Sequence, residues 1–571
     1  MKKITLNLLS ILFTIVLLNA QNTSKQNAEK YLSLKGELTF IFTITDDAEL
    51  ESLTRELSIV HFDPETNIVK AWANEKQFRN FETRNIPYQV PKNENEVDEN
   101  LIYDVRPLHE RSTTATNLTF PLATYPTYNE YEQQMQLFET TYPNLVDYFS
   151  IGATTEGDKE ILFVKISDNV GTDEQEPKLL YTSSMHGDEI AGYPMMLSLI
   201  DYILTVYNNT GHTDHARIKN LVENAEIWIN PNANPDGTYY LSGDNTSVTN
   251  ARRGNANDLD LNRNYPDNVD GPHPDGEAYQ TETLAFMALA DANHFVISAN
   301  FHGGIELVNY PFDNAYASTT TYHPEDPGYN GPYYTHPDTD WYEFISVEYA
   351  THAQTDSDTL GDLTYMTVDY DSYIYPSPGV THGAEWYRVY GGRQDYMNFY
   401  HQCREVTIEL SDDKTILESE LVDYWLYNKD ALLDYLTQGT YGFRGVVKDA
   451  STGNPIENAT ITIVGHDNYG SHTITDVNFG DFYRPIKAGT YNILIEAPCY
   501  SPETLNGESI SDYTINDLGD ILLTPNVAVP TSLTATNIQS TSADLSWSGG
   551  SASYDLRYRI NGAVSWTTVT G

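Results

Sequence analysis

Two His-x-x-Glu spacings in the sequence could hold a metal ion, His186-x-x-Glu189 and His382-x-x-Glu385. With 15 histidines in an acidic chain, about one such match is expected by chance, so the spacing alone has little specificity. The first pair follows the apolar run "KLLYTSSM" and precedes a helical pattern. It therefore lies at the carboxyl end of a predicted strand, the edge of an α/β sheet where functional sites form. Glu189 is predicted in the first helical turn, where an offset of three keeps both side chains on one side. His382 is predicted to lie in a loop rich in proline and glycine, so the first pair is the preferred half-site.

A third ligand and a base are also present as candidates. Catalytic zinc takes three protein ligands and keeps one position open. His302 ends the apolar run "HFVISANFH" and is followed by two glycines, which let the chain turn and a substrate approach. Glu409 lies late in the apolar run "EVTIEL", where a carboxylate is costly unless it is used or paired. An outward-facing glutamate on an alternating strand is the alternative for Glu409.

The segment "NARRGNANDLDLNRNYPD", residues 250–267, holds three arginines in a chain with only 32 lysines and arginines. Forked guanidinium groups suit bidentate binding of a carboxylate. The segment is therefore a candidate for binding an anionic group of a substrate. A solvated, turn-rich loop is the alternative.

The elements that must position these residues alternate between strand and helix from residue 118 to 438. Predicted strands cover residues 161–167, 178–185, 225–232, 294–301 and 404–410. Predicted helices cover residues 128–142, 189–207, 340–353 and 423–439. This order predicts an α/β domain with a mixed, largely parallel central sheet and helices on both faces. Residues 314–380, rich in Tyr, Pro, Asp and Thr, are expected to form a long surface excursion with one helix.

The segments before this domain have their own patterns. Two lysines, an apolar run to Leu18 and a small residue, Ala20, predict a signal peptide over residues 1–20 and a secreted or cell-surface protein. The run is short for a membrane anchor, which is the alternative. Residues 37–91 show a βαββαβ order that predicts a small split-βαβ, α+β domain. Residues 92–117 are an acidic linker.

After the α/β domain, short β-runs punctuated by Gly, Asn and Pro predict a β-sandwich at residues 441–525. Residues 528–571 resemble the start of a fibronectin type III-like domain. Such a domain needs about 90–100 residues, so this module is expected to be truncated. No other stretch is apolar enough for a membrane span.

The overall charge limits the partners. The formal net charge is −49 and the pI is about 4.4, which argues against nucleic acid and anionic membranes. Two cysteines do not support a disulfide framework or a zinc–thiolate site. The chain is expected to be a monomer.

Ordered motifs from about residue 125 to 520 resemble the zinc metallocarboxypeptidase family. The closer likeness is to the carboxypeptidase N/E-like subfamily, in which a transthyretin-like β-sandwich follows the catalytic domain. The motifs are "YPTYNEY", "SIGATTEGDKEILFVKISDN", "MHGDEIAG", "INPNANPDG", "DLDLNRNYPD", "FHGGIELVNYPFD", "GVTHGAEWYRVYGGRQD" and "EVTIELS".

The resemblance implies a role for each matched position. His186, Glu189 and His302 match the ligands of one Zn²⁺ ion, and Glu409 matches the general acid/base. The other matches concern the substrate. Arg253 matches an arginine that polarises the scissile carbonyl, and Asn262 with Arg263 matches a pair that anchors the C-terminal carboxylate. Tyr387 matches a mobile tyrosine, and Asp313 matches a pocket acid that favours a C-terminal Lys or Arg.

The function implied is secreted, zinc-dependent hydrolysis of the C-terminal residue of peptides or proteins, so peptide C-termini are the expected partners. One alternative is a carboxypeptidase for acidic or D-configured residues of cell-wall peptides, which a cationic Arg393 near the pocket would favour. An inactive adhesion or binding protein is another. Residues 37–91 resemble the shape of propeptides of digestive carboxypeptidases, and their role is inhibitory, chaperone-like or accessory.

Overall fold

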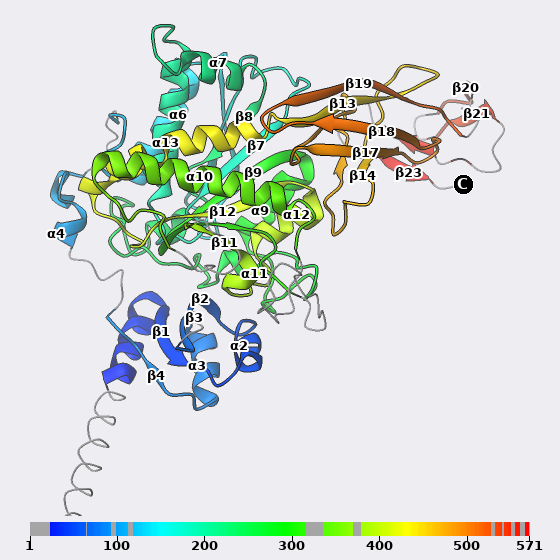
Figure 1. Ribbon diagram of the computed structural model, residues 1–571. Helices are drawn as coiled ribbons and strands as arrows, with labels where there is room; N and C mark the ends of the chain where they lie inside the picture. Colours follow the sequence, from blue (N-terminus) through cyan, green and yellow to red (C-terminus); the bar gives the residue numbers. More distant parts are fainter. Residues whose placement is uncertain are drawn as a thin grey trace, which may run out of the picture.

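The computed structural model describes residues 23–63, 66–92, 99–111, 118–315, 335–368 and 378–526, and parts of 531–569. The predicted signal peptide lies outside the described residues, as do parts of the acidic linker and of the expected excursion at 314–380. Three units follow one another within the described residues up to 526: a small N-terminal domain, a large α/β domain and a β-sandwich (Figure 1).

The N-terminal domain has the predicted βαββαβ order after a helical stretch at residues 23–35. Its elements are β1 (Glu37–Thr43), α2 (Asp47–Leu53), β2 (Ser58–Asp63), β3 (Ile68–Asn74), α3 (Glu75–Thr83) and β4 (Tyr88–Gln89). The antiparallel sheet has the order β2-β3-β1-β4, so β2 is an edge strand. The β2–β3 register shifts between Ile59 and His61, which makes Val60 the bulged residue. A bulge on an edge strand re-aims a side chain and ends regular pairing.

The α/β domain contains an eight-stranded sheet of order β11-β10-β12-β9-β7-β8-β6-β5. The strands are β5 (Val146–Ala153), β6 (Glu160–Ile166), β7 (Lys178–Ser183), β8 (Glu226–Asn230), β9 (Phe295–His302), β10 (Ile305–Tyr310), β11 (Val380–His382) and β12 (Arg404–Ser411). The pairs β7–β8, β7–β9, β9–β12 and β10–β11 are parallel, and the other three are antiparallel. The prediction of a mixed, largely parallel sheet is confirmed.

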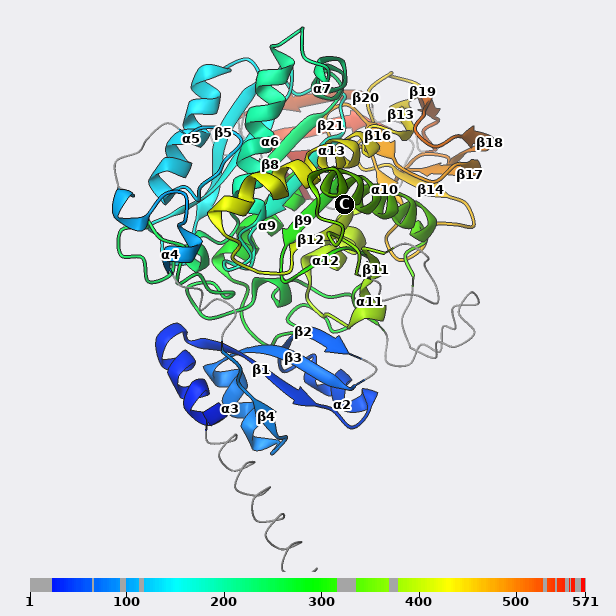
Figure 2. The same cartoon turned by 60° about the vertical axis from the view of Figure 1, so that its left-hand side comes forward.

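Helices cover both faces of this sheet (Figure 2). Those of the α/β domain and the segment before it are α4 (Glu99–Ile102), η1 (Leu108–Glu110), α5 (Tyr128–Thr141), α6 (Gly192–Tyr207), α7 (His215–Val222), α8 (Pro235–Thr238), η2 (Leu261–Arg263), α9 (Thr281–Ala292), α10 (Thr339–Leu360), α11 (Gly383–Trp386), α12 (Arg393–His401), η3 (Glu418–Glu420) and α13 (Leu421–Gln438). Helices α5, α6, α10 and α13 contribute to one core cluster and α9 and α12 to another. Strand β7 contributes to both clusters, because Leu179 and Tyr181 point to the first and Leu180 points to the second.

Three local predictions were wrong. Helix α6 begins at Gly192 rather than at Glu189. Glu189 instead closes a turn that starts at His186, and the N–H of Ile190 donates to the carbonyl of Lys414. Helix α10 is not part of a surface excursion, since Trp341 and other side chains along it are buried in the main core. His382 ends β11 and pairs with β10, so it does not lie in a loop.

The β-sandwich consists of two facing sheets, β16-β13-β19 and β15-β14-β17-β18. Its strands are β13 (Gly442–Asp449), β14 (Thr460–Ile463), β15 (Thr473–Ile474), β16 (Asp481–Arg484), β17 (Gly489–Glu496), β18 (Glu503–Ile510) and β19 (Ile515–Leu523). Contacts of the buried Asp338 join it to the α/β domain: its carboxylate lies 2.9 Å from Arg484, 2.8 Å from His466 and 3.1 Å from Arg404. Beyond it lie β20 (Thr531–Thr536), β21 (Asp544–Ser548), β22 (Leu556–Tyr558) and β23 (Thr567–Val569), and their fibronectin-like nature stays a prediction.

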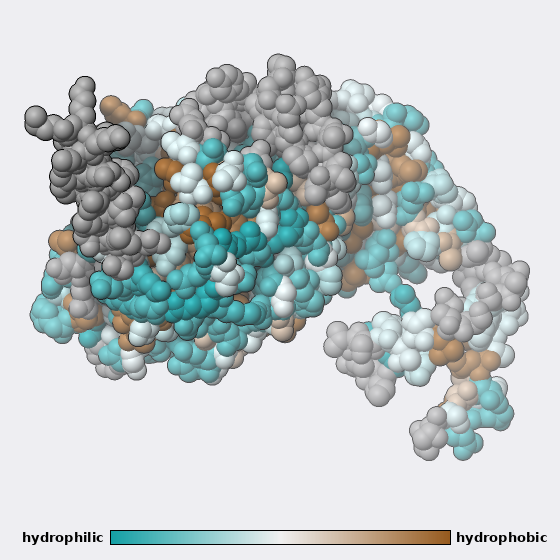
Figure 3. Space-filling model, turned by 90° about the horizontal axis from the view of Figure 1, so that it is seen from below, coloured by the Kyte–Doolittle hydropathy of each residue, from teal (hydrophilic) through white to brown (hydrophobic). Residues whose placement is uncertain are grey.

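Hydrophilic residues dominate the face of the molecule seen in Figure 3, in keeping with the net charge of −49. Within the described ranges, every helix is too short or too polar to cross a lipid bilayer.

Candidate metal and substrate site

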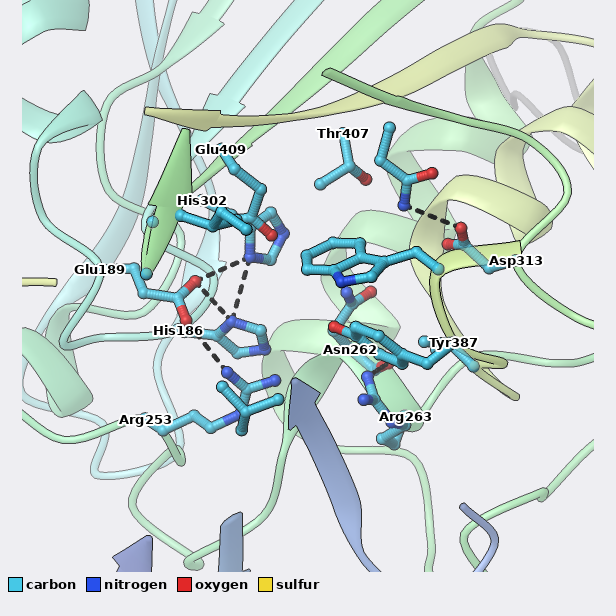
Figure 4. Close-up of a pocket in the computed structure, with 17 residues that line it drawn as sticks. His186, Glu189, Arg253, Asn262, Arg263, His302, Asp313, Tyr387, Thr407 and Glu409 are labelled. Carbon is cyan, nitrogen blue, oxygen red and sulfur yellow. Dashed lines mark hydrogen bonds and ion pairs between the residues drawn. The ribbon is translucent and has the colours of Figure 1, made fainter. Parts of the chain in front are cut away.

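Three metal-ligand candidates converge where strands β7 and β9 end (Figure 4). The Oε2 atom of Glu189 lies 2.7 Å from His186 Nδ1 and 2.8 Å from His302 Nδ1, and the two Nδ1 atoms are 3.0 Å apart. His302 ends β9 as predicted. His186 and Glu189 meet through a turn, closed by a hydrogen bond from the Glu189 N–H to the His186 carbonyl. Two imidazoles and one carboxylate are a common ligand set of catalytic zinc.

The partners of these side chains support a metal site. Nε2 of His186 lies 3.0 Å from the Asp260 carboxylate. A carboxylate only accepts, so in the neutral imidazole Nε2 carries the proton and Nδ1 presents its lone pair to the cluster. Burial lowers the pKa of His302 to about 4, which keeps this ring neutral at pH 7. Burial favours the neutral form of Glu189, yet His186 and Lys414 hold its pKa well below the usual range. Two imidazole nitrogens and one anionic oxygen facing one point fit a divalent cation.

Glu409 reaches the same cavity from β12. Strands β12 and β9 are parallel, and Glu409 pairs with His302 in register, so the base candidate stands beside a ligand candidate. Its side chain is 9% exposed, and Oε2 has no hydrogen-bond partner within the described part of the chain. Burial, reinforced by the charge of Glu189, raises the pKa of Glu409 well above its usual value. A divalent cation at the three ligands would act in the opposite direction.

The arginine-rich segment lines another wall of the cavity. Arg253 donates from Nη1 to Glu189 at 3.0 Å and from Nε to Asp260 at 2.9 Å. Asn262 and Arg263 lie in η2, and Arg263 Nη1 donates to the Asn262 carbonyl at 2.9 Å. The Asn262 side-chain oxygen accepts from the main-chain N–H at residue 393 at 2.9 Å. The adjacent pair therefore presents a fixed polar surface to the cavity.

Asp313 is the acid at the other end of the cavity (Figure 4). Its Oδ1 accepts from Asn309 Nδ2 at 2.9 Å and from Gln394 Nε2 at 3.0 Å. Burial raises the pKa of Asp313 to about 6 although Arg263 opposes the shift, so the carboxyl is mostly ionised at neutral pH. Tyr387 also lines the cavity and packs against the apolar core of the N-terminal domain. The structure thus brings all nine predicted site residues to one cavity.

Arg393 does not lie in this cavity, contrary to expectation. Its side chain is 1% exposed and pairs with Glu405, whose Oε2 lies 2.7 Å from Nη2. A further hydrogen bond goes to Thr182. The buried Glu405 carboxylate neutralises the charge of Arg393 outside the cavity, so Arg393 cannot act on a substrate side chain.

Sequence reasoning missed two charged residues of the site. Asp260 orients His186, and Lys414 contacts Glu189 Oε1 at 2.9 Å. The only signal for Asp260 was its place in "DLDLNR", and Lys414 in "SDDK" resembles a solvated turn.

The N-terminal domain forms part of the cavity. Val60 is among the lining residues, and the Ile59 carbonyl accepts from Arg263 Nη2 at 3.2 Å. The Glu37 carboxylate accepts from the main-chain N–H of Arg253 at 2.9 Å and from that of the next glycine at 3.1 Å. Figure 4 shows a strand of this domain reaching toward the cavity between Arg253 and Arg263.

A second contact lies at the rim. Glu51 of α2 hydrogen bonds to Arg388 and to the hydroxyl of Tyr390, the latter at 2.7 Å. Both belong to the segment that carries Tyr387, and the guanidinium of Arg55 stacks over the Tyr390 ring at 4.1 Å. Edge strand β2 and helix α2 therefore together cover the cavity.

The family model for zinc carboxypeptidases matches residues 131–431, more than half of the chain, and that for the carboxypeptidase regulatory-like domain matches residues 442–524. The chain belongs to the zinc carboxypeptidase family. Carboxypeptidase D of Mus musculus is 36% identical over 375 residues, which is 65% of this chain and 25% of that protein. The carboxypeptidase N catalytic chain of Homo sapiens is 31% identical over 408 residues, 66% of this chain and 81% of that protein. Among solved structures, carboxypeptidase A from Helicoverpa armigera is 17% identical, covers 71% of this chain and 98% of its own, and has a TM-score of 0.49.

Proposed function

We propose that this chain is a zinc-dependent carboxypeptidase that releases the C-terminal residue of peptides or proteins and prefers Lys or Arg there. One observation carries the proposal: three metal-ligand candidates, a buried carboxylate whose Oε2 has no hydrogen-bond partner among the described residues, an Asn–Arg pair and an acid all line one cavity. One Zn²⁺ ion is expected, held by His186, Glu189 and His302.

Each residue has a role that follows from its place. Zinc, when bound, supplies Lewis-acid chemistry that polarises a carbonyl and activates water. Arg263 and Asn262 bind the free carboxylate of the substrate, which fixes the last peptide bond and makes the enzyme an exopeptidase. The Arg253 guanidinium stabilises negative charge on the carbonyl oxygen. Glu409 takes a proton from the attacking water and passes it to the leaving amine.

The preference for basic residues rests on Asp313, because an ionised carboxylate at the end of the cavity attracts a cationic side chain. The alternative substrate, an acidic residue of a cell-wall peptide, depended on a cationic Arg393, whose charge Glu405 neutralises. A non-catalytic adhesion role is also disfavoured, since all ligand candidates and Glu409 are present.

A panel of short peptides ending in Lys, Arg, Phe, Leu and Glu tests the function. We expect release of single C-terminal residues, fastest for Lys and Arg, that stops with a zinc chelator and returns with added zinc. Asp313→Asn should lower kcat/KM for the basic peptides at least about tenfold, because a charged hydrogen bond is lost, and spare the Phe peptide. Chelator-insensitive release would contradict the zinc assignment, and faster release from Phe than from Arg would contradict that of Asp313.

We also propose that residues 37–91 act as a covering domain that must move before a peptide can bind. Val60 lines the cavity, and the Ile59 carbonyl accepts from Arg263 Nη2, a donor that a substrate carboxylate needs. A peptide C-terminus and the bulge of β2 compete for the same donor. The domain therefore lowers activity while it is docked.

We propose secretion on the strength of the N-terminal run alone. Mass spectrometry of the exported protein should find Gln21 as its first residue, and a retained residue 1 would contradict the proposal.

A further inference from the structure

Lys414 is a buried cation next to the metal-ligand candidates. It follows β12 by three residues, and its side chain is 6% exposed. Its Nζ lies 2.9 Å from Glu189 Oε1 and 3.7 Å from Asp188 Oδ2. Its main-chain carbonyl accepts from the N–H of Ile190 at 3.1 Å. The residue therefore braces the turn that carries His186 and Glu189 by both its side chain and its backbone.

The two oxygens of Glu189 have different neighbours. Oε2 faces the ring nitrogens of His186 and His302 at 2.7 and 2.8 Å. Oε1 receives two cationic donors, Arg253 at 3.0 Å and Lys414 at 2.9 Å. This division leaves one oxygen for a metal ion and keeps the other away from it.

The two cations differ in what else they can reach. Arg253 lines the cavity, whereas Lys414 is not among the lining residues. Under the proposed function, the Arg253 guanidinium turns to the carbonyl oxygen of the substrate. That movement carries Nη1 away from Glu189 Oε1, so this contact then weakens.

We propose that Lys414 is a positioning residue that holds Glu189 Oε1 permanently, so that Arg253 is free to serve the substrate. Lys414 keeps the carboxylate in its orientation toward the metal whether or not Arg253 is engaged. Without Lys414, the buried carboxylate depends on Arg253 alone and retains it. The part of this inference that concerns Arg253 rests on the proposed function, and the part that concerns the ligand orientation does not.

The test uses the full chain with Lys414→Met, which removes the charge and keeps the length, and Lys414→Arg, which keeps the charge. The zinc dissociation constant is measured by competition with a chelating dye, without peptide. Loss of a residue that orients a metal ligand typically weakens metal binding or activity about 10- to 100-fold, and we expect Lys414→Met to weaken zinc binding by about tenfold or more.

The kcat of Lys414→Met should fall while its KM changes little, and Lys414→Arg should recover most of the zinc affinity and most of the kcat. Lys429→Met, on α13 outside the cavity, is the matched control and should match the parent.

Zinc binding by Lys414→Met within twofold of the parent would overturn the proposal. If Lys414→Met and Lys414→Arg lose zinc affinity and kcat equally, and both have a lower Tm, the role of Lys414 is purely structural. That result would also overturn the proposal. If Lys414→Met does not fold, Lys414→Gln replaces it with the same expectations. A chain that binds zinc with the expected dependence on Lys414 but releases no C-terminal residue would refute the proposed function and leave the ligand-orientation inference standing.

Discussion

Replacing Glu409 by glutamine is expected to lower kcat by about 10³-fold, within the range of about 10² to 10⁴ that general acid–base catalysis contributes. Glutamine has the same shape but cannot take a proton at neutral pH. Glu409 Oε2 has no hydrogen-bond partner in the described residues, so the substitution breaks no contact of that oxygen. Steady-state kinetics with a Lys-ending peptide measure the loss.

Two controls separate chemistry from folding. Zinc content and Tm of Glu409→Gln should equal those of the parent, because the three ligand candidates are untouched. Glu503→Gln makes the same change at an exposed position of β18 and should leave kcat unchanged. A Glu409→Gln enzyme with kcat within tenfold of the parent would remove Glu409 from its role.

Replacing Glu51 by lysine is expected to raise kcat/KM of the full chain about 100-fold. Glu51 joins α2 to Arg388 and to Tyr390 at the cavity rim. Lysine would lose both contacts and oppose Arg388 across the interface. Like charges across an interface cost several kcal/mol, and about 3 kcal/mol of lost docking corresponds to about 100-fold more of the uncovered state. Progress curves with a short basic peptide measure the gain.

Glu56→Lys is the matched control, because it reverses the same charge within the same domain. Glu56 pairs with Arg84 of its own domain at 3.0 Å, so this variant should disturb the domain without touching the interface. If Glu56→Lys activates as much as Glu51→Lys, domain instability rather than the Glu51 contact explains the effect. If neither activates, the covering role is wrong.

The sequence predicts the centre of the fold better than its edges. Strands such as β9, with every residue buried, appear as largely apolar runs because helices cover both faces. Strand β11 has three residues, too few for a pattern. Similarly, His302 and Glu409 stood out as polar residues at the ends of apolar runs. Lys414 did not, because a lysine after "SDD" looks solvated until the fold buries it.

Contacts between segments far apart in the chain could not be predicted from the sequence. The Ile59–Arg263 hydrogen bond joins residues 204 positions apart, and no local pattern encodes it. Arg393 shows the same limit at short range, since its partner Glu405 is only 12 positions away. A sequence pattern contains residue types and their spacing. The pairing of buried charges depends instead on which strand and helix ends meet in space.

The charges around Asp338 have a consequence for how the chain can be divided. Asp338 precedes α10, Arg404 begins β12, and Arg484 and His466 belong to the sandwich. Removing one partner of a buried ion pair is strongly destabilising. A cut near residue 440 would therefore strip Asp338 of two of its three partners named here and leave Arg404 to compensate it alone. In energetic terms the strand that bears Glu409 and the sandwich behave as one cooperative unit, although the sequence reads as two modules.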